Sequence, residues 1–448
     1  MVPDEAPILM ARRIRSGAAE PERPAGLLPD SPHPWVQLRS VSFHPFVYDR
    51  MVSHADPQAA PGDIVAVYDK HGQIFGHGLY NPRSRIAVRM LSYAPSPIDE
   101  AFWRERIGAT VRLRRETLRL DDVTDAYRLI HAEGDGLSGL IVERYADHLV
   151  FELFSLGMFQ RVDLLAGLVA EELSLRSVSE GDGDRKGRDA GRDSREGGCE
   201  KGLSHQRWKR VVRADASIEQ VEGFSVTDEL STGRTSVTVR EHGVRFRVDM
   251  ARGHKTGFFC DQRDNRRLLA TLCRDADVLD MCCYSGGFGL YAKVLGGARE
   301  VTSVDLDEQA LALARDNANL NQVRIRHVHA DAFPYLRQMA ANQRPFDVIV
   351  LDPPKLIGSR DEFADGRQKY LDLNKLALQI MRPGGVLLTC SCSGLLSRED
   401  FVDVVRQAAR ITNRRAVLFN STGSGGDHPI ALDCPETSYL KALWLRVL

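Results

Sequence analysis

The chain has 448 residues, 43% hydrophobic and 27% charged, a composition typical of a globular protein with two or three domains. Its 60 lysines and arginines and 61 aspartates and glutamates give a net charge of −1, which excludes a general basic field, so any nucleic-acid site must be a local patch. No apolar run reaches the length of a membrane span and no apolar core follows the first arginines, so we expect a cytoplasmic protein with no secretory signal and no membrane partner.

The eight cysteines are scattered and show no paired CxxC spacing. We therefore predict no metal site and expect reduced thiols, one of which could be catalytic.

Residues 1–32 are rich in Pro, Ala, Glu and Arg and predict a disordered tail. From 33 to 98, short alternating strands with glycine turns predict a small β-barrel. Residues 81–85 and Arg89 add a basic cluster, which is either a solvated rim or an RNA contact. The phrase from Gly78 to Arg89 resembles a PUA domain, an RNA-binding barrel.

Residues 99–237 predict a middle α+β module. Its first helix, over 99–120, has an apolar stripe at Ile107, Val111, Leu118 and Leu120. We place the helix's arginines on the remaining surface, where they either solvate the helix or contact RNA: Arg104, Arg106, Arg112, Arg114, Arg115 and Arg119. Strands at 127–131, 139–145 and 149–154 and a helix at 158–173 follow. Residues 176–206, a low-complexity stretch of mixed charge, predict a disordered insertion.

Residues 238–448 open with a predicted hairpin over 238–250 and then alternate strands and helices, which predicts a doubly wound, mostly parallel α/β sheet. The predicted helices are 307–319, 333–341, 366–381 and 397–411, and a final antiparallel pair is 416–420 with 439–447. The predicted strands end at Asp280, Asp305, Asp331, Asp352 and Cys392. Ligands of such sheets bind at the carboxyl ends of the strands, so these five side chains should meet at one edge.

The stretch from Asp277 to Asp305 reads as a βαβ unit with a glycine turn at 286–289. The turn is neither GxGxxG nor a P-loop, and neighbouring acids would repel a pyrophosphate. The pattern instead favours S-adenosylmethionine, with Asp280 near its positive groups and Asp305 on the ribose hydroxyls. Asp331 could bind the adenine amino group, cap the following helix, or do both.

The motif Asp352-Pro-Pro-Lys355 predicts an acid held beside this cofactor by a stiff turn. The alternative is that Asp352 only begins an Asp-Pro turn and has no functional role. N6-adenine and amide methyltransferases usually have an aromatic where Lys355 stands, which argues against that subclass.

Cys390 and Cys392 end the fifth strand and should face the same way, with Cys392 nearer its mouth. A strand cysteine is usually a buried packing residue. Beside a cofactor and an acid, however, a thiolate could add to C6 of cytosine and make C5 nucleophilic enough to accept a methyl group. We favour Cys392 as this nucleophile and keep Cys390 as the alternative.

From residue 33 onward, apart from the insertion, the chain resembles the bacterial 23S ribosomal RNA large-subunit cytosine-5 methyltransferases, which join a PUA domain, a middle module and a class I methyltransferase domain. The motifs that carry the resemblance are 128–144, 255–266, Asp280 with 286–289, 352–355, 391–393 and 439–441. The resemblance implies that Cys392 is the nucleophile, that Asp352 contacts the base, and that RNA, with 23S ribosomal RNA favoured, is the partner; it leaves a homodimer open.

The resemblance also implies an S-adenosylmethionine site. Its expected contacts are Lys255, Phe258, Asp261, Gln262, Arg263, Asp280, Tyr284, Ser285, Gly286, Gly287, Phe288, Asp305, Leu306, Asp331, Ala332 and Pro353. Cys282 and Cys283 make the glycine turn richer in thiols than we would expect for this group. Two alternatives stay open: methylation of another RNA base atom, such as a guanine nitrogen, and a non-catalytic RNA-binding factor in ribosome assembly.

Overall fold

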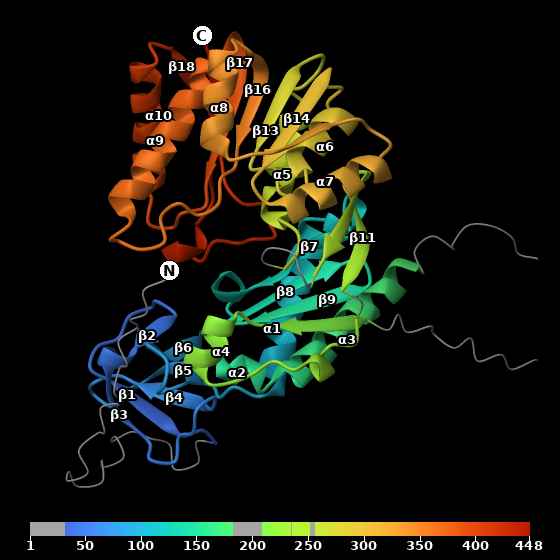
Figure 1. Cartoon of the computed structure of the whole chain (residues 1–448). Helices are drawn as coiled ribbons and strands as arrows, with labels where there is room; N and C mark the ends of the chain where they lie inside the picture. Colours follow the sequence, from blue (N-terminus) through green and yellow to red (C-terminus); the bar gives the residue numbers. More distant parts are fainter. Residues whose placement is uncertain (1–31, 182–207, 234, 251–255) are drawn as a thin grey trace, which may run out of the picture. The chain divides into compact units, whose positions relative to one another are not determined.

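A six-stranded sheet forms the first of two units in the computed structural model, which describes residues 32–181, 208–233, 235–250 and 256–448 (Figure 1). The units divide between Ile98 and Asp99. The predicted tail, except residue 32, and the predicted insertion from 182 onward lie outside the described residues. Among the residues that are described, no helix combines the length and the apolar character needed to cross a membrane.

The sheet of the first unit has the order β2-β6-β5-β4-β1-β3, antiparallel except for the parallel pair β1 and β4. Its strands are β1 (Trp35–Leu38), β2 (Phe46–Tyr48), β3 (Val52–Ala55), β4 (Ile64–Tyr68), β5 (Ile74–Tyr80) and β6 (Ile86–Ser92). Alternate residues, including Val65, Val67 and Val88, form its core. For Arg89 the structure excludes the first of the two readings of the basic cluster, a solvated rim: Arg89 is buried, with its guanidinium 5.3 Å from the ring centre of Phe46.

The second unit begins with an α+β module. Its four-stranded sheet has the order β10-β9-β8-β7, and α3 extends through Gly181, six residues into the predicted insertion. The elements are α1 (Glu100–Arg112), β7 (Ala126–His131), β8 (Leu140–Tyr145), β9 (His148–Leu153), α2 (Leu156–Phe159), α3 (Val162–Gly181), β10 (Lys209–Arg213), α4 (Ala216–Glu222), β11 (Ser236–Glu241) and β12 (Val244–Asp249). β11 and β12 form the predicted antiparallel hairpin.

The seven-stranded sheet of this unit has the order β15-β14-β13-β16-β17-β19-β18; β19 is antiparallel to both β17 and β18, and the other neighbouring pairs are parallel. Its strands are β13 (Asp277–Met281), β14 (Glu300–Asp305), β15 (Arg326–His329), β16 (Phe346–Leu351), β17 (Met381–Ser391), β18 (Ala416–Thr422) and β19 (Lys441–Val447). The predicted doubly wound sheet is thus confirmed. All of the predicted strand-end residues follow or end parallel strands except Asp280, which is the penultimate residue of β13.

Helices cover both faces of this sheet. They are α5 (Arg263–Ala270), α6 (Gly287–Val294), α7 (Glu308–Leu320), α8 (Ala332–Ala341), α9 (Phe363–Gln379) and α10 (Arg398–Ile411). Leu279, Ile349 and Leu387 pack with residues of α8, α9 and α10, whereas Val278 and Leu388 pack with α5 and α6. Neighbouring residues of the central strands are therefore buried on opposite faces of the sheet, as expected when helices cover both faces.

The prediction that Arg114 lies on the exposed face of its helix is wrong. Arg114 is fully buried and donates to both carboxylate oxygens of Asp135, at 2.7 and 2.8 Å, and to the main-chain oxygen of Asp427, at 2.7 Å. Its spacing of three from Val111 and seven from Ile107 puts it on the apolar stripe, not opposite it. This arginine joins the middle module to the segment before β19.

Candidate active site

A cavity of about 740 Å³ opens at the carboxyl ends of the parallel strands, within the second unit. Fourteen of the predicted site residues line it: Phe258, Asp261, Gln262, Tyr284, Ser285, Gly287, Phe288, Asp305, Leu306, Asp331, Ala332, Asp352, Pro353 and Cys392. Arg263, Asp280 and Gly286 do not line it, and Lys255 lies outside the described residues. The strand-end row is therefore brought together, apart from Asp280.

Asp280 fixes the glycine turn through a hydrogen bond to its main chain. Asp280 is fully buried, and its Oδ2 accepts a 2.9 Å hydrogen bond from the main-chain N–H of Gly289. Its Oδ1 has no hydrogen-bond partner within the described ranges. Gly286, with φ of +81°, adopts the left-handed conformation that glycine favours and precedes α6. Asp280 thus shapes the loop, where we had predicted a direct cofactor contact.

Burial raises the pKa of Asp280 to about 7. Between about pH 4 and pH 7 the folded protein therefore keeps a proton that the unfolded chain releases, so this group lowers the free energy of unfolding as the pH rises. We expect Asp280→Asn to remove this dependence: between pH 4.5 and 8 the cofactor-free wild type should lose about 3 kcal/mol relative to the variant. Urea denaturation across this range measures the difference.

Asp403 provides an exposed control for this measurement, because its side chain is 50% exposed. Asp403→Asn should follow the wild-type pH dependence. If the free energy of unfolding changed with pH in the same way for wild type and Asp280→Asn, the assignment of this titration to Asp280 would be contradicted.

Two further carboxylates face the cavity. Asp305 accepts hydrogen bonds from the main-chain N–H groups of Tyr284, at 2.7 Å, and Asp307, at 2.9 Å, which fix its position at the end of β14. Asp331 caps α8 through a 2.8 Å bond from the N–H of Phe333 and still lines the cavity, so the capping role and a ligand role are compatible. Leu306, 63% exposed, lies beside Asp305.

The chemistry of these residues fits S-adenosylmethionine. The cavity has the size of a small-molecule site, and its lining is mostly apolar with a few carboxylates. An exposed leucine in a cavity provides an apolar surface for a base such as adenine, and the carboxylate of Asp305 is a suitable acceptor for ribose hydroxyls. Gly287, Asp305, Leu306 and Asp331 would therefore hold the nucleoside half.

Sequence reasoning missed several residues around the cavity, among them Phe259, Arg266 and Phe333. Arg266 forms a buried ion pair with Glu241 at 2.7 Å and donates to the main-chain oxygen of Phe259 at 2.9 Å, which secures that segment. Both Phe259 and Arg266 lie in the 255–266 motif, and Phe333 follows Asp331 by two residues. Their proximity to predicted residues was the available signal.

Arg263, a predicted cofactor contact, points away from the cavity. It is buried and pairs with Asp427, its Nη2 lying 2.6 Å from the carboxylate Oδ1. It therefore belongs to the junction that also contains Arg114.

The two cysteines at the end of β17 differ in accessibility. Cys392 is half-buried and lines the cavity with Asp352. Cys390 is fully buried, and burial holds the pKa of its thiol well above the ordinary value. On the neighbouring strand β19, the buried ammonium of Lys441 donates to the main-chain oxygen of Ser393 at 2.7 Å, and burial lowers the pKa of Lys441 to about 8. Of these two cysteines, Cys392 is therefore the one that a ligand in the cavity could reach; Cys282 and Cys283 of the glycine turn also line the cavity.

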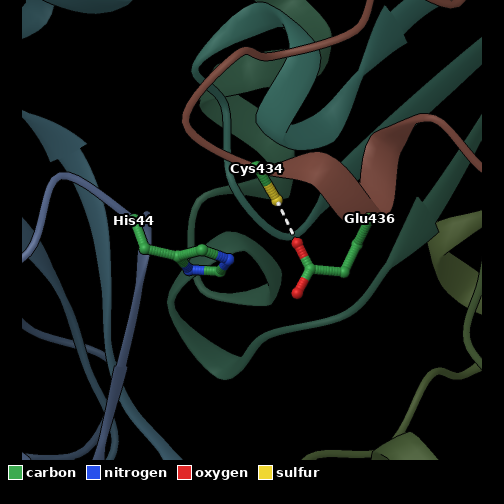
Figure 2. Close-up of side chains that lie close together, drawn as sticks. All are labelled: His44, Cys434 and Glu436. Carbon is green, nitrogen blue, oxygen red and sulfur yellow. Dashed lines mark hydrogen bonds between the residues drawn. The ribbon is translucent and has the colours of Figure 1, made fainter. Parts of the chain in front are cut away.

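Cys434 shows the contrasting packing role. It precedes the short helical turn Pro435–Thr437, is buried, and donates a 3.5 Å hydrogen bond to Glu436 (Figure 2). Burial raises the pKa of its thiol to about 12, so it stays protonated at neutral pH.

The seven-stranded sheet, the glycine turn and the cavity at the strand ends define an S-adenosylmethionine-dependent class I methyltransferase. Family profiles agree: the S-adenosylmethionine-dependent methyltransferase profile matches residues 207–416, across our predicted boundary at 237, and the PUA-like domain profile matches residues 37–93. The predictions of the fold class and of the cofactor are confirmed.

The chain belongs to the family of ribosomal RNA large subunit methyltransferase I. It is 33% identical to the Aliivibrio fischeri (strain MJ11) member over 412 residues, covering 90% of this chain and 96% of the relative. It is 35% identical to the Shewanella denitrificans member over 422 residues, covering 93% and 95%.

Solved structures show the same fold at lower identity. SMU.776, solved in complex with SAH, matches 90% of this chain and 95% of its own with a TM-score of 0.68 and 18% identity. A candidate S-adenosylmethionine-dependent methyltransferase from Streptococcus mutans matches 92% and 100% with a TM-score of 0.69 and 18% identity.

Proposed function

We propose that this protein methylates C5 of a cytosine in large-subunit ribosomal RNA, with Cys392 as the nucleophile and S-adenosylmethionine as the methyl donor. The observation that carries the proposal is the position of an accessible thiol, Cys392, on the same cavity as Asp352 and the glycine turn. The names of the relatives support ribosomal RNA as the substrate, and a ribosomal substrate would place the reaction in the cytoplasm. The PUA-like domain supports RNA as the partner.

The chemistry follows from the poor nucleophilicity of cytosine C5. The Cys392 thiolate forms a bond to C6, which places electron density on C5. C5 then bonds to the methyl carbon as the bond from that carbon to the donor sulfur breaks. A base removes the C5 proton, the C5–C6 double bond re-forms, and the thiolate leaves. When bound, the cofactor supplies an electrophilic methyl group.

Asp352 and the RNA conformation complete the proposal. A carboxylate beside the ring edge can accept a hydrogen bond from the exocyclic amine of cytosine, which orients the base over the thiol. The target must be unpaired or flipped out of its helix to enter the cavity. We assign Asp352 this contact because it lines the cavity with Cys392.

RNA carrying 5-fluorocytosine provides a direct test. Fluorine replaces the C5 hydrogen, so there is no C5 proton for the general base to remove. The elimination cannot be completed, and the cysteine adduct should accumulate. We expect a covalent protein–RNA complex that survives denaturing electrophoresis, whose cross-linked peptide contains Cys392. Mass spectrometry of nucleosides from the unmodified substrate should show 5-methylcytosine. Methylated guanine or another product without an adduct would contradict the proposal.

A further inference from the structure

A chain of four hydrogen bonds runs from the core to Asp352. The indole N–H of Trp444 donates to the hydroxyl of Thr422 at 2.9 Å, and that hydroxyl donates to Oδ1 of Asn265 at 2.6 Å. The Nδ2 group of Asn265 donates to Oε1 of Gln262 at 2.7 Å, and Nε2 of Gln262 donates to Oδ2 of Asp352 at 3.1 Å. The chain links β19, β18, α5 and the end of β16.

The direction of this chain is fixed at its inner end. An indole N–H can only donate, so the Thr422 hydroxyl accepts from Trp444 and keeps its own proton for Asn265. Asn265 is fixed a second time, because its Nδ2 also donates to the main-chain oxygen of Gly423 at 3.1 Å and a carbonyl can only accept. The oxygen of the Gln262 amide must then face Asn265, which leaves its NH2 group to face Asp352.

Burial makes this chain of hydrogen bonds rigid. Gln262 and Asn265 are 3% and 1% exposed, and Trp444 is fully buried. Water cannot replace a broken link at such positions, so reversing either amide would leave buried polar groups unpaired. Only the last two members, Gln262 and Asp352, line the cavity.

We infer that Gln262 is a positioning residue of the methyl-transfer site: as the last link of the chain it holds the Asp352 carboxylate as a hydrogen-bond acceptor toward the target base. This assignment rests on the proposed function, in which Asp352 contacts that base. It differs from the role of Gln262 suggested by the family resemblance, which was contact with the cofactor.

Gln262→Glu tests the inference, because it keeps the shape and replaces the donor by a carboxylate oxygen. We expect kcat to fall about 100-fold, since a misplaced catalytic group costs about that factor. The affinity for S-adenosylmethionine, measured by calorimetry, should change less than about threefold, because the bond lost is not to the cofactor. The acidic limb of the pH–rate profile should shift to higher pH, because a second carboxylate beside Asp352 disfavours the ionised form of Asp352 and so raises its pKa.

A double-mutant cycle with Asp352→Asn separates positioning from other effects. If Gln262 acts through Asp352, Gln262→Glu should reduce kcat much less in the Asp352→Asn background than in the wild type. Gln338→Glu, a change of the same kind on an exposed face of α8, should leave kcat and the pH profile unchanged.

Thr422→Val gives a second route if Gln262→Glu does not fold. It removes a hydroxyl that lies three hydrogen bonds from Asp352, at a residue that does not line the cavity, and should lower kcat with unchanged cofactor affinity. A loss of cofactor affinity as large as the loss of kcat, or an unchanged kcat, would overturn the inference. If the wild type still forms the Cys392 adduct, such a result rejects the role of Gln262 alone; if it forms none, the proposed function has failed.

Discussion

Cys392→Ala is expected to lower cytosine methylation by about 10³-fold or more, because in the proposed mechanism C5 gains its electron density from the bond between the Cys392 thiolate and C6. Binding of S-adenosylmethionine should be retained, since the change removes one sulfur atom from a half-buried position at the end of β17. Transfer of a tritiated methyl group to RNA, together with calorimetry of cofactor binding, measures the two effects separately.

Cys390→Ala is the matched control, since it removes the same atom two residues earlier on the same strand. Cys390 is fully buried and lies in the core cluster with Leu388 and Trp444. We expect a modest loss of stability from the small void. Because the Cys390 thiol contacts the Gln262 side chain, methylation should fall a little, but far less than in Cys392→Ala. Undiminished methylation by Cys392→Ala, or its loss only in Cys390→Ala, would remove Cys392 from the mechanism.

Much of this site could be predicted because its information is local. Alternating apolar strands and helices fix which residues end the parallel strands, and those ends share one edge of the sheet. Asp305, Asp331, Asp352 and Cys392 line the cavity for this reason. Periodicity left the choice between Cys390 and Cys392 open, since both face the same side; the structure separates them by their depth along the strand.

The polar connections could not be predicted, because they join residues far apart in sequence. Arg114 and Asp427 are 313 residues apart, and Arg263 and Asp427 are 164 apart. No local pattern says which buried arginine meets which carboxylate. For Arg114 the helical spacing from Ile107 and Val111 did carry a signal, because a charged residue on an apolar stripe needs a buried partner. Arg263 offered no comparable signal.

Asp427 lies at the centre of this junction. Its carboxylate accepts from Nη2 of Arg263 at 2.6 Å and from the main-chain N–H of Arg128 at 3.0 Å, while its main-chain oxygen accepts from Arg114. Asp427 is fully buried, and despite this burial the neighbouring His428 and Arg263 hold its pKa well below the ordinary value. The carboxylate is therefore the counter-charge for a buried arginine directly beside Gln262.

We expect Asp427→Asn to lower the free energy of unfolding by about 3–5 kcal/mol, the usual cost of leaving a buried charge without its partner. Denaturation in urea at pH 7 measures this loss. The exposed control Asp403→Asn, which breaks only a surface pair with Arg406, should lose less than about 1 kcal/mol.

The pH dependence gives this prediction a second readout. Because the folded-state pKa of Asp427 is depressed, its contribution is fully present above about pH 4, the ordinary carboxyl value, and is lost as the pH falls toward the folded-state value. The difference in the free energy of unfolding between wild type and Asp427→Asn should therefore become smaller as the pH is lowered. An equal loss in the two variants at pH 7, or a difference that does not change with pH, would show that Asp427 does not stabilise the junction by its charge.

Since Arg263 begins α5 next to Gln262, we also expect Asp427→Asn to lower kcat in the folded fraction, through a less rigid Gln262.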